Sequence, residues 1–375
     1  MIPLNQNLNA LKRSQIRVFA NLARETPGCA SLTIGEPDLD TPENIKQAAM
    51  DALMANQTHY APNQGTPALR QAIAEFESNR GNPTKPEQVL VTVGACQALF
   101  TALLGILNPG EEIIVPTPGF GLYETIATIA GAKTVPLDVS KTGFQITKDA
   151  LVEVITEKTK AIIINSPCNP TGVIFNQESL DAVKKAVLGK PIFVICDNVY
   201  HDLSYAPCPD ISCDADLKEQ MILCQSFSKP WAMTGWRIGY LVCPEYVMER
   251  LLLLSAATIT AVPTFLQEAA ITALNTPVDP MREIYRKRRD YVCGRLKAMG
   301  LSFPEPEGAF YVFVNVAKFG MDSATFCTRM IREGLLAAVP GACFGADDYI
   351  RLSYCYSDEE LKTGLDRLEA FIATL

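Results

Sequence analysis

The sequence lacks most of the patterns by which metal-binding and dinucleotide-binding proteins are recognised. It has only two histidines, and its twelve cysteines are scattered with no C-x-x-C pair, so no zinc site of the usual spacing is predicted. Cys208 and Cys213 lie near His201, but without a further cysteine pair we predict no metal there. No G-x-G-x-x-G occurs, since Gly119-x-Gly121 lacks the third glycine, and a dinucleotide fingerprint is therefore absent.

Excess positive charge and long apolar runs are also missing. The net charge is −8, which argues against an electrostatic nucleic-acid binder. The one basic run, residues 286–289, lies among apolar residues at helical spacing, which is typical of a helix with a solvated basic face. The longest apolar stretch, 251–266, is interrupted by hydroxyl residues and Pro263. It predicts a buried helix and loop, and no membrane span.

The sequence shows neither a secretory signal nor a disulfide framework. Its N-terminus has no apolar signal region, and cysteines such as Cys196 and Cys224 lie inside apolar runs, where a free thiol behaves as a small hydrophobe. We therefore expect a cytoplasmic protein. With 375 residues, nearly half of them apolar, the chain is long enough for one large domain and a smaller one.

The order of apolar segments predicts an α/β fold. Strands of near-continuous apolar character alternate with helices, which is typical of a mostly parallel sheet covered by helices on both faces. The predicted strands of this large domain are residues 89–93, 112–115, 133–137, 161–164, 192–196, 221–224 and 239–243.

After about residue 280 the pattern changes to that of a smaller α+β unit. A long helix is followed by an alternating strand at 309–314, a helix at 323–333, a strand at 349–354 and a final helix from Asp358. We therefore predict three parts: an irregular N-terminal arm (1–40) that packs with the small domain, a large domain (41–279) and a small C-terminal domain (280–375).

The loop between the last two predicted strands of the large domain holds residues suited to a carbonyl compound that carries a phosphate. A partly desolvated lysine near an arginine, as Lys229 is near Arg237, can lose its proton and attack a carbonyl as a neutral amine. Ser226, Ser228 and Arg237 are candidate phosphate ligands. Pyridoxal phosphate is a compound of this kind. The alternative is that Lys229 is an ordinary surface lysine.

Further polar residues follow other predicted strands, where ligands of open α/β sheets bind. Gly94, Ala95 and Cys96 open a helix whose free N–H groups favour a phosphate. Asp197 ends a hydrophobic strand and needs a cation; a protonated pyridine nitrogen would serve and would keep the ring electron-accepting. The alternative for Asp197 is a helix N-cap.

Three more side chains complete the candidate cofactor site, and one arginine extends it. Asn169 and Tyr200 are placed to reach the phenolic oxygen of the ring, and Phe120 to stack on its face; the alternatives are a turn for Asn169 and core packing for Phe120. Arg351, in a short apolar strand, fits a substrate carboxylate taken in bidentate fashion. A structural ion pair is the alternative for Arg351.

With these residues in order, the chain resembles the class I and II aminotransferases of the fold-type I pyridoxal phosphate enzymes. The resemblance covers nearly the whole chain and rests on Asn169-Pro170-x-Gly172, Asp197-x-x-Tyr200, Ser226-x-Ser228-Lys229, Gly235-x-Arg237 and Arg351. It implies pyridoxal phosphate held as a Schiff base on Lys229, with Asp197 at the pyridine nitrogen. It implies Asn169 and Tyr200 at the ring oxygen, and the phosphate at Gly94 to Cys96, Ser226 and Arg237.

The same resemblance implies the substrates and an assembly. Arg351 would hold the α-carboxylate of an amino acid or a 2-keto acid, with the Gly35 backbone beside it. Tyr60 is similar to a residue that reaches the phosphate of the neighbouring subunit, so a homodimer with shared active sites is implied. Lys229 would carry the proton during transamination as general base and acid.

Two subgroups and two other functions stay open at this point. Residues 92–99 are similar to bacterial aspartate/prephenate aminotransferases, but those have a lysine where this chain has Cys96, which leaves recognition of a second carboxylate open. Residues 233–239 also resemble N-acetyl-diaminopimelate and aromatic aminotransferases. A β C–S lyase of cystathionine type shares the fold and cofactor residues. A non-enzymatic pyridoxal phosphate regulator would need a DNA-binding segment, for which we expect no room before Ser31.

Overall fold

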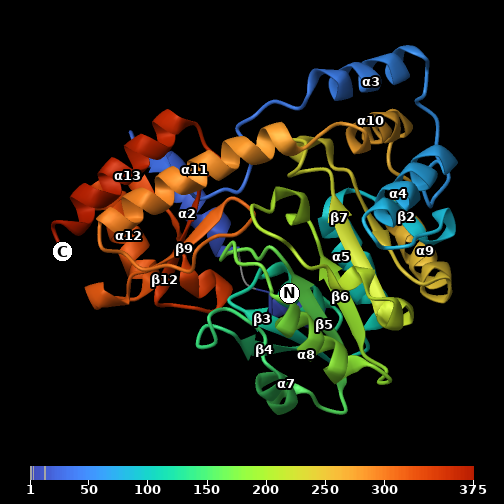
Figure 1. Cartoon of the computed structure of the whole chain (residues 1–375), viewed down its shortest axis with the longest axis horizontal. Coiled ribbons are helices and arrows are strands. Elements are labelled where there is room, and N and C mark those ends of the chain that lie inside the picture. The colour runs from blue at the N-terminus through green and yellow to red at the C-terminus, as the bar shows by residue number, and fades with distance from the viewer. Residues whose placement is uncertain (1, 3, 12–13) are drawn as a thin grey trace.

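The computed structural model describes residues 2, 4–11 and 14–375. A seven-stranded sheet forms the centre of the larger part, in the strand order β2-β8-β7-β6-β5-β3-β4 (Figure 1). Only β8 runs antiparallel to its neighbours, which confirms the mostly parallel sheet. The strands are β2 (Val89–Thr92), β3 (Glu112–Thr117), β4 (Lys133–Asp138), β5 (Thr159–Asn165), β6 (Phe193–Asp197), β7 (Met221–Ser226) and β8 (Gly239–Val242).

Helices cover both faces of this sheet (Figure 1), which explains why its strands are apolar at nearly every position. In β5, Ile162 and Ile164 belong to the hydrophobic core on one face, whereas Ala161 and Ile163 belong to that on the other, as the two-residue period of a strand requires. One core includes α5 (Gly94–Ile106), α6 (Leu122–Ile129) and α9 (Glu245–Ile259). The other includes α3 (Glu43–Met54), α4 (Pro67–Asn79), α7 (Lys148–Val154), α8 (Gln177–Val187) and α10 (Thr264–Leu274).

The C-terminal part has its own antiparallel sheet and a third core. The sheet has the order β11-β12-β9. Its strands are β9 (Tyr311–Asn315), β11 (Val339–Pro340) and β12 (Tyr349–Ser353), and its helices are α11 (Asp279–Ala298), α12 (Ser323–Gly334) and α13 (Asp358–Ile372). The sequence thus predicted each of its main elements to within a few residues.

The N-terminal segment differs from the irregular arm that was predicted. After the short α1 (Gln6–Asn9), residues Gln15–Glu25 form α2, and Ala30–Ser31 form β1, which pairs in parallel with β10 (Leu336–Ala337). Helix α2 buries Phe19, Ala20 and Ala23, of which Phe19 and Ala23 belong to the core of the C-terminal part. These apolar positions lie on one face of a helix, but two are alanines and gave only a weak pattern. The boundaries at residues 40 and 280 stay a prediction.

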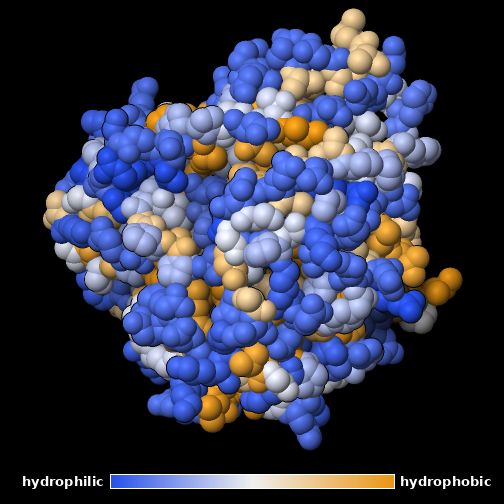
Figure 2. All heavy atoms as spheres, turned by 45° about the vertical axis from the view of Figure 1, so that its right-hand side comes forward, coloured by the Kyte–Doolittle hydropathy of each residue, from blue (hydrophilic) through white to orange (hydrophobic). Residues whose placement is uncertain are grey.

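The surface is mostly hydrophilic on the face drawn in Figure 2, where hydrophobic residues form small separate groups. Among the large apolar side chains that stay exposed are Met50, Leu53 and Met54 of α3 and the nearby Tyr60. Within the described ranges, no helix is long and apolar enough to cross a membrane. Through Met50, Leu53 and Met54, helix α3 presents an apolar edge that the described residues of the chain leave uncovered.

One buried carboxyl group on α4 gives a testable stability effect. Glu77 is 3% exposed and accepts a hydrogen bond from the Tyr240 hydroxyl at 2.6 Å. Burial raises the pKa of Glu77 to about 7, although Arg80 and the Tyr240 hydrogen bond act in the opposite direction. Because the unfolded pKa is about 4.3, the folded state binds more protons between these two values. The free energy of unfolding therefore falls as pH rises through this window.

We expect Glu77→Gln to remove this loss, because glutamine keeps an acceptor for Tyr240 but does not titrate. The free energy of unfolding of the variant should gain up to about 3 kcal/mol over that of the wild type between pH 4.5 and pH 7.5. Urea unfolding of both proteins across this range measures the difference. The same pH dependence in both proteins would show that Glu77 is ionised throughout.

Candidate active site

The carboxyl ends of β5 and β6 bring three polar side chains together. Asn165 ends β5 and lies opposite Asp197, which ends β6. The Asn165 side chain donates to the Asp197 carbonyl at 2.9 Å and accepts from the Asn169 backbone N–H at 2.9 Å. Asn165 therefore fixes the spacing between the two segments that carry Asp197 and Asn169.

Asp197 is a buried carboxylate without a cation. The residue is 4% exposed, and its carboxylate accepts hydrogen bonds from the Tyr123 hydroxyl at 2.6 Å and from the Val199 N–H at 3.4 Å. Burial raises the pKa of Asp197 to about 6, against the lowering effect of these two donors. No lysine, arginine or histidine of the described chain pairs with it. Asp197 ends a strand and caps no helix, so the N-cap alternative is wrong.

Lys229 lies in the loop between β7 and β8 and points toward the N-terminal segment. Its Nζ donates to the Gly35 carbonyl at 2.6 Å and lies 5.7 Å from the centre of the Phe310 ring. Burial lowers the pKa of Lys229, while Cys355 and other acidic neighbours act in the opposite direction. Because no carboxylate of the described residues pairs with it, Lys229 differs from an ordinary surface lysine.

The start of α5 and the loop after β7 form a narrow cradle. A Cβ atom at Gly94 would lie 2.8 Å from Nη2 of Arg237, and one at Gly239 would lie 3.0 Å from the Ala95 backbone nitrogen. Gly94 has a positive φ of 71°, and a Cβ atom at Gly239 would also lie 2.6 Å from the Gln225 carbonyl oxygen, so both positions favour glycine. The Ser226 hydroxyl, at the end of β7, donates to that of Ser228 at 2.9 Å. The first turn of a helix, two hydroxyls and a guanidinium thus lie close together, and this set of donors fits a phosphate.

Arg351 is buried on β12 and is held by oxygen atoms that carry no charge. Its Nη1 donates to Oδ1 of Asn169 at 2.9 Å, and its Nη2 donates to the Thr33 carbonyl at 2.5 Å. Its guanidinium carbon lies 4.3 Å from the ring centre of Tyr311 and 5.0 Å from that of Phe344. Nε has no hydrogen-bond partner, and no carboxylate of the described chain pairs with Arg351.

The structure supports neither a simple turn role for Asn169 nor a structural ion pair for Arg351. The side chain of Asn169 is engaged by Arg351 and does not simply stabilise a turn, and Arg351 forms no protein ion pair in the part of the chain that the structure describes. A buried guanidinium with an unsatisfied N–H needs an acceptor from outside the chain. A carboxylate would provide one.

Three predicted residues lie at the edge of this arrangement or outside it. Phe120 is partly buried against the core and meets Tyr123 edge to face at 5.9 Å between ring centres, so it also packs as the alternative had it. Cys96 is exposed in the first turn of α5. Partial burial raises the pKa of its thiol, while Arg237 and Lys229 act in the opposite direction. Tyr60 is 93% exposed, and no hydrogen bond or ring contact in the described chain joins it to the others.

Sequence reasoning missed several residues that hold the site. Tyr123 and Asn165 both hydrogen-bond to Asp197, and the Thr33 carbonyl binds Arg351. Tyr311 donates to or accepts from Tyr200. A tyrosine in an apolar helix or strand predicts only core packing, and no local pattern shows which carboxylate it reaches.

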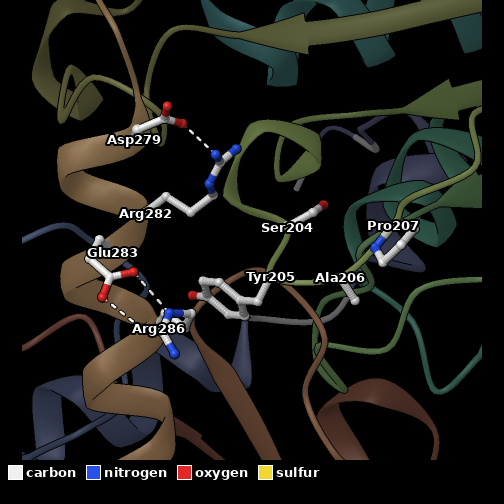
Figure 3. Close-up of a pocket in the computed structure, with 8 residues that line it drawn as sticks. All are labelled: Ser204, Tyr205, Ala206, Pro207, Asp279, Arg282, Glu283 and Arg286. Carbon is white, nitrogen blue, oxygen red and sulfur yellow. Dashed lines mark hydrogen bonds and ion pairs between the residues drawn. The ribbon is translucent and has the colours of Figure 1, made fainter.

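A separate hollow beside α11 holds none of the predicted residues (Figure 3). It is lined by residues 204–207 and by four charged side chains of α11. Two of these, Arg286 and Glu283, pair at 2.7 Å, and Arg282 pairs with Asp279. Both arginines are thus already neutralised. No group of three or more histidine, cysteine, aspartate or glutamate residues that could hold a metal ion occurs in the described ranges.

Comparisons with known proteins agree with this geometry. Residues 27–368 match the family "Aminotransferase class I and II". The chain is 37% identical to the probable N-acetyl-LL-diaminopimelate aminotransferase of Bacillus subtilis, covering 98% of this chain and 95% of that protein. It is 37% identical to the aromatic-amino-acid aminotransferase 2 of Thermococcus litoralis, covering 98% and 97%.

The likeness extends to solved structures. The aspartate aminotransferase of Thermus thermophilus with maleate superposes with a TM-score of 0.94 at 35% identity, covering 99% of this chain and all of that chain. The fold-type I architecture is thereby confirmed. Because these relatives are aminotransferases, amino-group transfer is favoured over the C–S lyase reaction and over a non-enzymatic regulator. The chain belongs to the class I and II aminotransferases, enzymes of a family that uses pyridoxal phosphate.

Proposed function

We propose that the chain binds pyridoxal phosphate at Lys229 and moves an amino group between an L-amino acid and a 2-keto acid. The observation that carries this proposal is the amine of Lys229, which donates to the Gly35 carbonyl and pairs with no carboxylate of the described residues, together with the unsatisfied Nε of Arg351. An amine of lowered pKa is a nucleophile toward an aldehyde. A buried guanidinium with a free N–H offers a place for a carboxylate.

The donor set fits the cofactor at each of its polar groups. We assign the phosphate to the first turn of α5, with Ser226, Ser228 and Arg237, because glycine at residues 94 and 239 makes the room. We assign the pyridine nitrogen to Asp197, whose buried carboxylate needs a cation. Asn169 and Tyr200 are assigned to the phenolic oxygen, and Phe120 to the ring face. When bound, pyridoxal phosphate accepts the electron pair released at the substrate Cα.

The remaining groups act on the substrate. Arg351 binds its α-carboxylate through Nε and the adjacent nitrogen, and this orients the Cα–H bond toward Lys229. Lys229 would take the Cα proton as general base and would give it, as general acid, to the aldehyde carbon of the cofactor. Its position beside the Gly35 carbonyl keeps the amine within reach. Burial away from water lowers the pKa of Lys229 and so favours the neutral amine that this role requires.

We infer that the enzyme is a homodimer with shared active sites. Tyr60 is almost fully exposed and follows the uncovered apolar edge of α3, Met50, Leu53 and Met54. A second copy of the chain would bury this edge and could bring Tyr60 to the partner's phosphate. We also place the enzyme in the cytoplasm, because all twelve cysteines are free thiols.

The donor amino acid is what separates the relatives from one another, since by name they act on N-acetyl-LL-diaminopimelate, aromatic amino acids or aspartate. Cys96 brings no cation to the position next to Arg237, so a second carboxylate finds no charge partner at residue 96. A spectroscopic half-reaction screen of the purified enzyme against the common amino acids and diaminopimelate derivatives identifies the donor.

Reduction with borohydride tests the cofactor assignment directly. We expect the loaded protein, after reduction and peptide mapping, to show a pyridoxyl group on Lys229 alone. The competing lysine nearest in character is Lys218, which is partly buried and also has a pKa lowered by burial. A label on Lys218 or another lysine, or a purified protein that takes up no pyridoxal phosphate, would overturn the proposal.

A further inference from the structure

Tyr311 on β9 touches three of the residues assigned above, although the proposed function gives it no role. Its hydroxyl lies 2.7 Å from that of Tyr200, and the Arg351 guanidinium lies 4.3 Å above its ring. A Cβ atom at Gly35 would lie 1.8 Å from the Tyr311 hydroxyl, so glycine is required for the segment to pass this close. Tyr311 therefore stands where the cofactor, carboxylate and lysine groups meet.

The hydroxyls of Tyr200 and Tyr311 form one hydrogen bond with each other, and only one of the two can donate in it. Tyr200 and Tyr311 are both buried, and in the described chain each has only the other as a hydrogen-bond partner. Either hydroxyl can donate in this pair. Each phenol has one O–H donor, so a Tyr200 that donates to the cofactor's phenolic oxygen must accept from Tyr311. A donor that is itself an acceptor forms a stronger hydrogen bond.

The aromatic ring of Tyr311 has a second contact of a different kind. The guanidinium of Arg351 lies over the rings of both Tyr311 and Phe344, which supplies cation–π attraction and favours one orientation of its plane. A phenylalanine at residue 311 would preserve this ring contact but not the hydroxyl pair. The two contacts can thus be separated by substitution.

We propose that Tyr311 is a positioning residue that directs the Tyr200 proton toward the cofactor's phenolic oxygen and holds the Arg351 guanidinium in the plane that receives the substrate carboxylate. This inference rests on the proposed function, because it takes Tyr200 and Arg351 in the roles assigned there. Simple packing does not explain the pair. Tyr285 is buried in the same core and also packs on Phe310, yet its hydroxyl has no partner among the described residues.

The test compares Tyr311→Phe and Tyr311→Leu with Tyr285→Phe as the matched control. A hydrogen bond to the phenolic oxygen lowers the basicity of the nitrogen shared by cofactor and Lys229. Tyr311→Phe should therefore raise the apparent pKa of the bound cofactor's visible absorbance by about one unit, within the range of a single hydrogen-bond effect. Its KM for the amino acid should stay within about twofold, because the ring remains on Arg351.

Tyr311→Leu removes the ring as well, and we expect the KM for both substrates to rise about tenfold, the equivalent of a cation–π contact of one to two kcal/mol. Tyr285→Phe should change neither quantity. The charged and titratable neighbours of the hydroxyl pair, Arg351, Asp197 and Cys355, are the same in all four proteins.

The outcomes separate this inference from the proposed function. If wild type and variants bind pyridoxal phosphate but Tyr311→Phe titrates like the control, the proton-directing role is wrong. If Tyr311→Leu keeps the wild-type KM, the ring's role on Arg351 is wrong; should that variant not fold, the titration of Tyr311→Phe still decides the first role. If the wild type itself shows no cofactor absorbance, the proposed function fails first.

Discussion

Lys229→Ala is expected to lower kcat for amino-group transfer by at least about 10³-fold, a loss typical of removing a group that is both attachment point and general base. The cofactor loses its covalent partner, and no other amine of the described chain lies beside the Gly35 carbonyl. We also expect the protein to lose the visible absorbance of the attached cofactor. Stopped-flow half-reactions and absorbance spectra measure both effects.

The control for this change is Lys218→Ala, which removes another partly buried lysine with a pKa lowered by burial. Lys218 lies in the 3₁₀ helix Ala215–Gln220 that precedes β7, at the opposite end of this strand from Ser226, so its loss should leave kcat unchanged. Addition of a small primary amine should restore part of the activity of Lys229→Ala only. Full activity in Lys229→Ala would end the assignment of Lys229.

The second large effect is expected at Arg351. Arg351→Leu should reduce kcat/KM for the amino acid by about 10² to 10³-fold, as expected when one partner of a buried charged pair is removed. The substrate carboxylate loses its donors, and Oδ1 of Asn169 and the Thr33 carbonyl also lose theirs. Steady-state kinetics with the donor found by the half-reaction screen measure the loss.

Two further variants show whether this loss belongs to carboxylate binding. Arg351→Lys should recover only part of the activity, because a lysine has no planar fork. Arg289→Leu removes an arginine of α11 that bonds to Asp290 and the Pro306 carbonyl, and it should leave kcat/KM within about twofold. Equal losses in Arg351→Leu and Arg289→Leu would point to general destabilisation and against a substrate role.

The sequence predicted the elements whose hydrophobic pattern is strong. Strand β5 is apolar along its length because helices cover both faces of the sheet, and the helix predicted at 323–333 is α12, Ser323–Gly334. Helix α2 was missed because its buried face is mainly alanine. The hydrophobic pattern of the sequence therefore predicted the elements whose buried side chains are large, and it failed for α2, where two of the three buried side chains are alanine.

The same distinction applies to the site. Lys229, Asp197 and Arg351 were found because a charged side chain in or beside an apolar run is costly to bury unless it binds a partner. Tyr123 and Tyr311 were not, because tyrosine is common in cores and its hydrogen bonds depend on residues far away in the sequence. Their partners lie 74 and 111 residues away, and only the folded chain shows which ones they are.

The short segment from Thr33 to Gly35 has a consequence for any effort to alter this enzyme. The Thr33 carbonyl accepts a hydrogen bond from Arg351, and the Gly35 carbonyl accepts one from Lys229. One short backbone segment thus holds both side chains, and a shift of this segment would move Arg351 and Lys229 together. Engineering of residues before Asp40 should therefore be judged by its effect on chemistry, even though this part of the chain contributes no catalytic side chain.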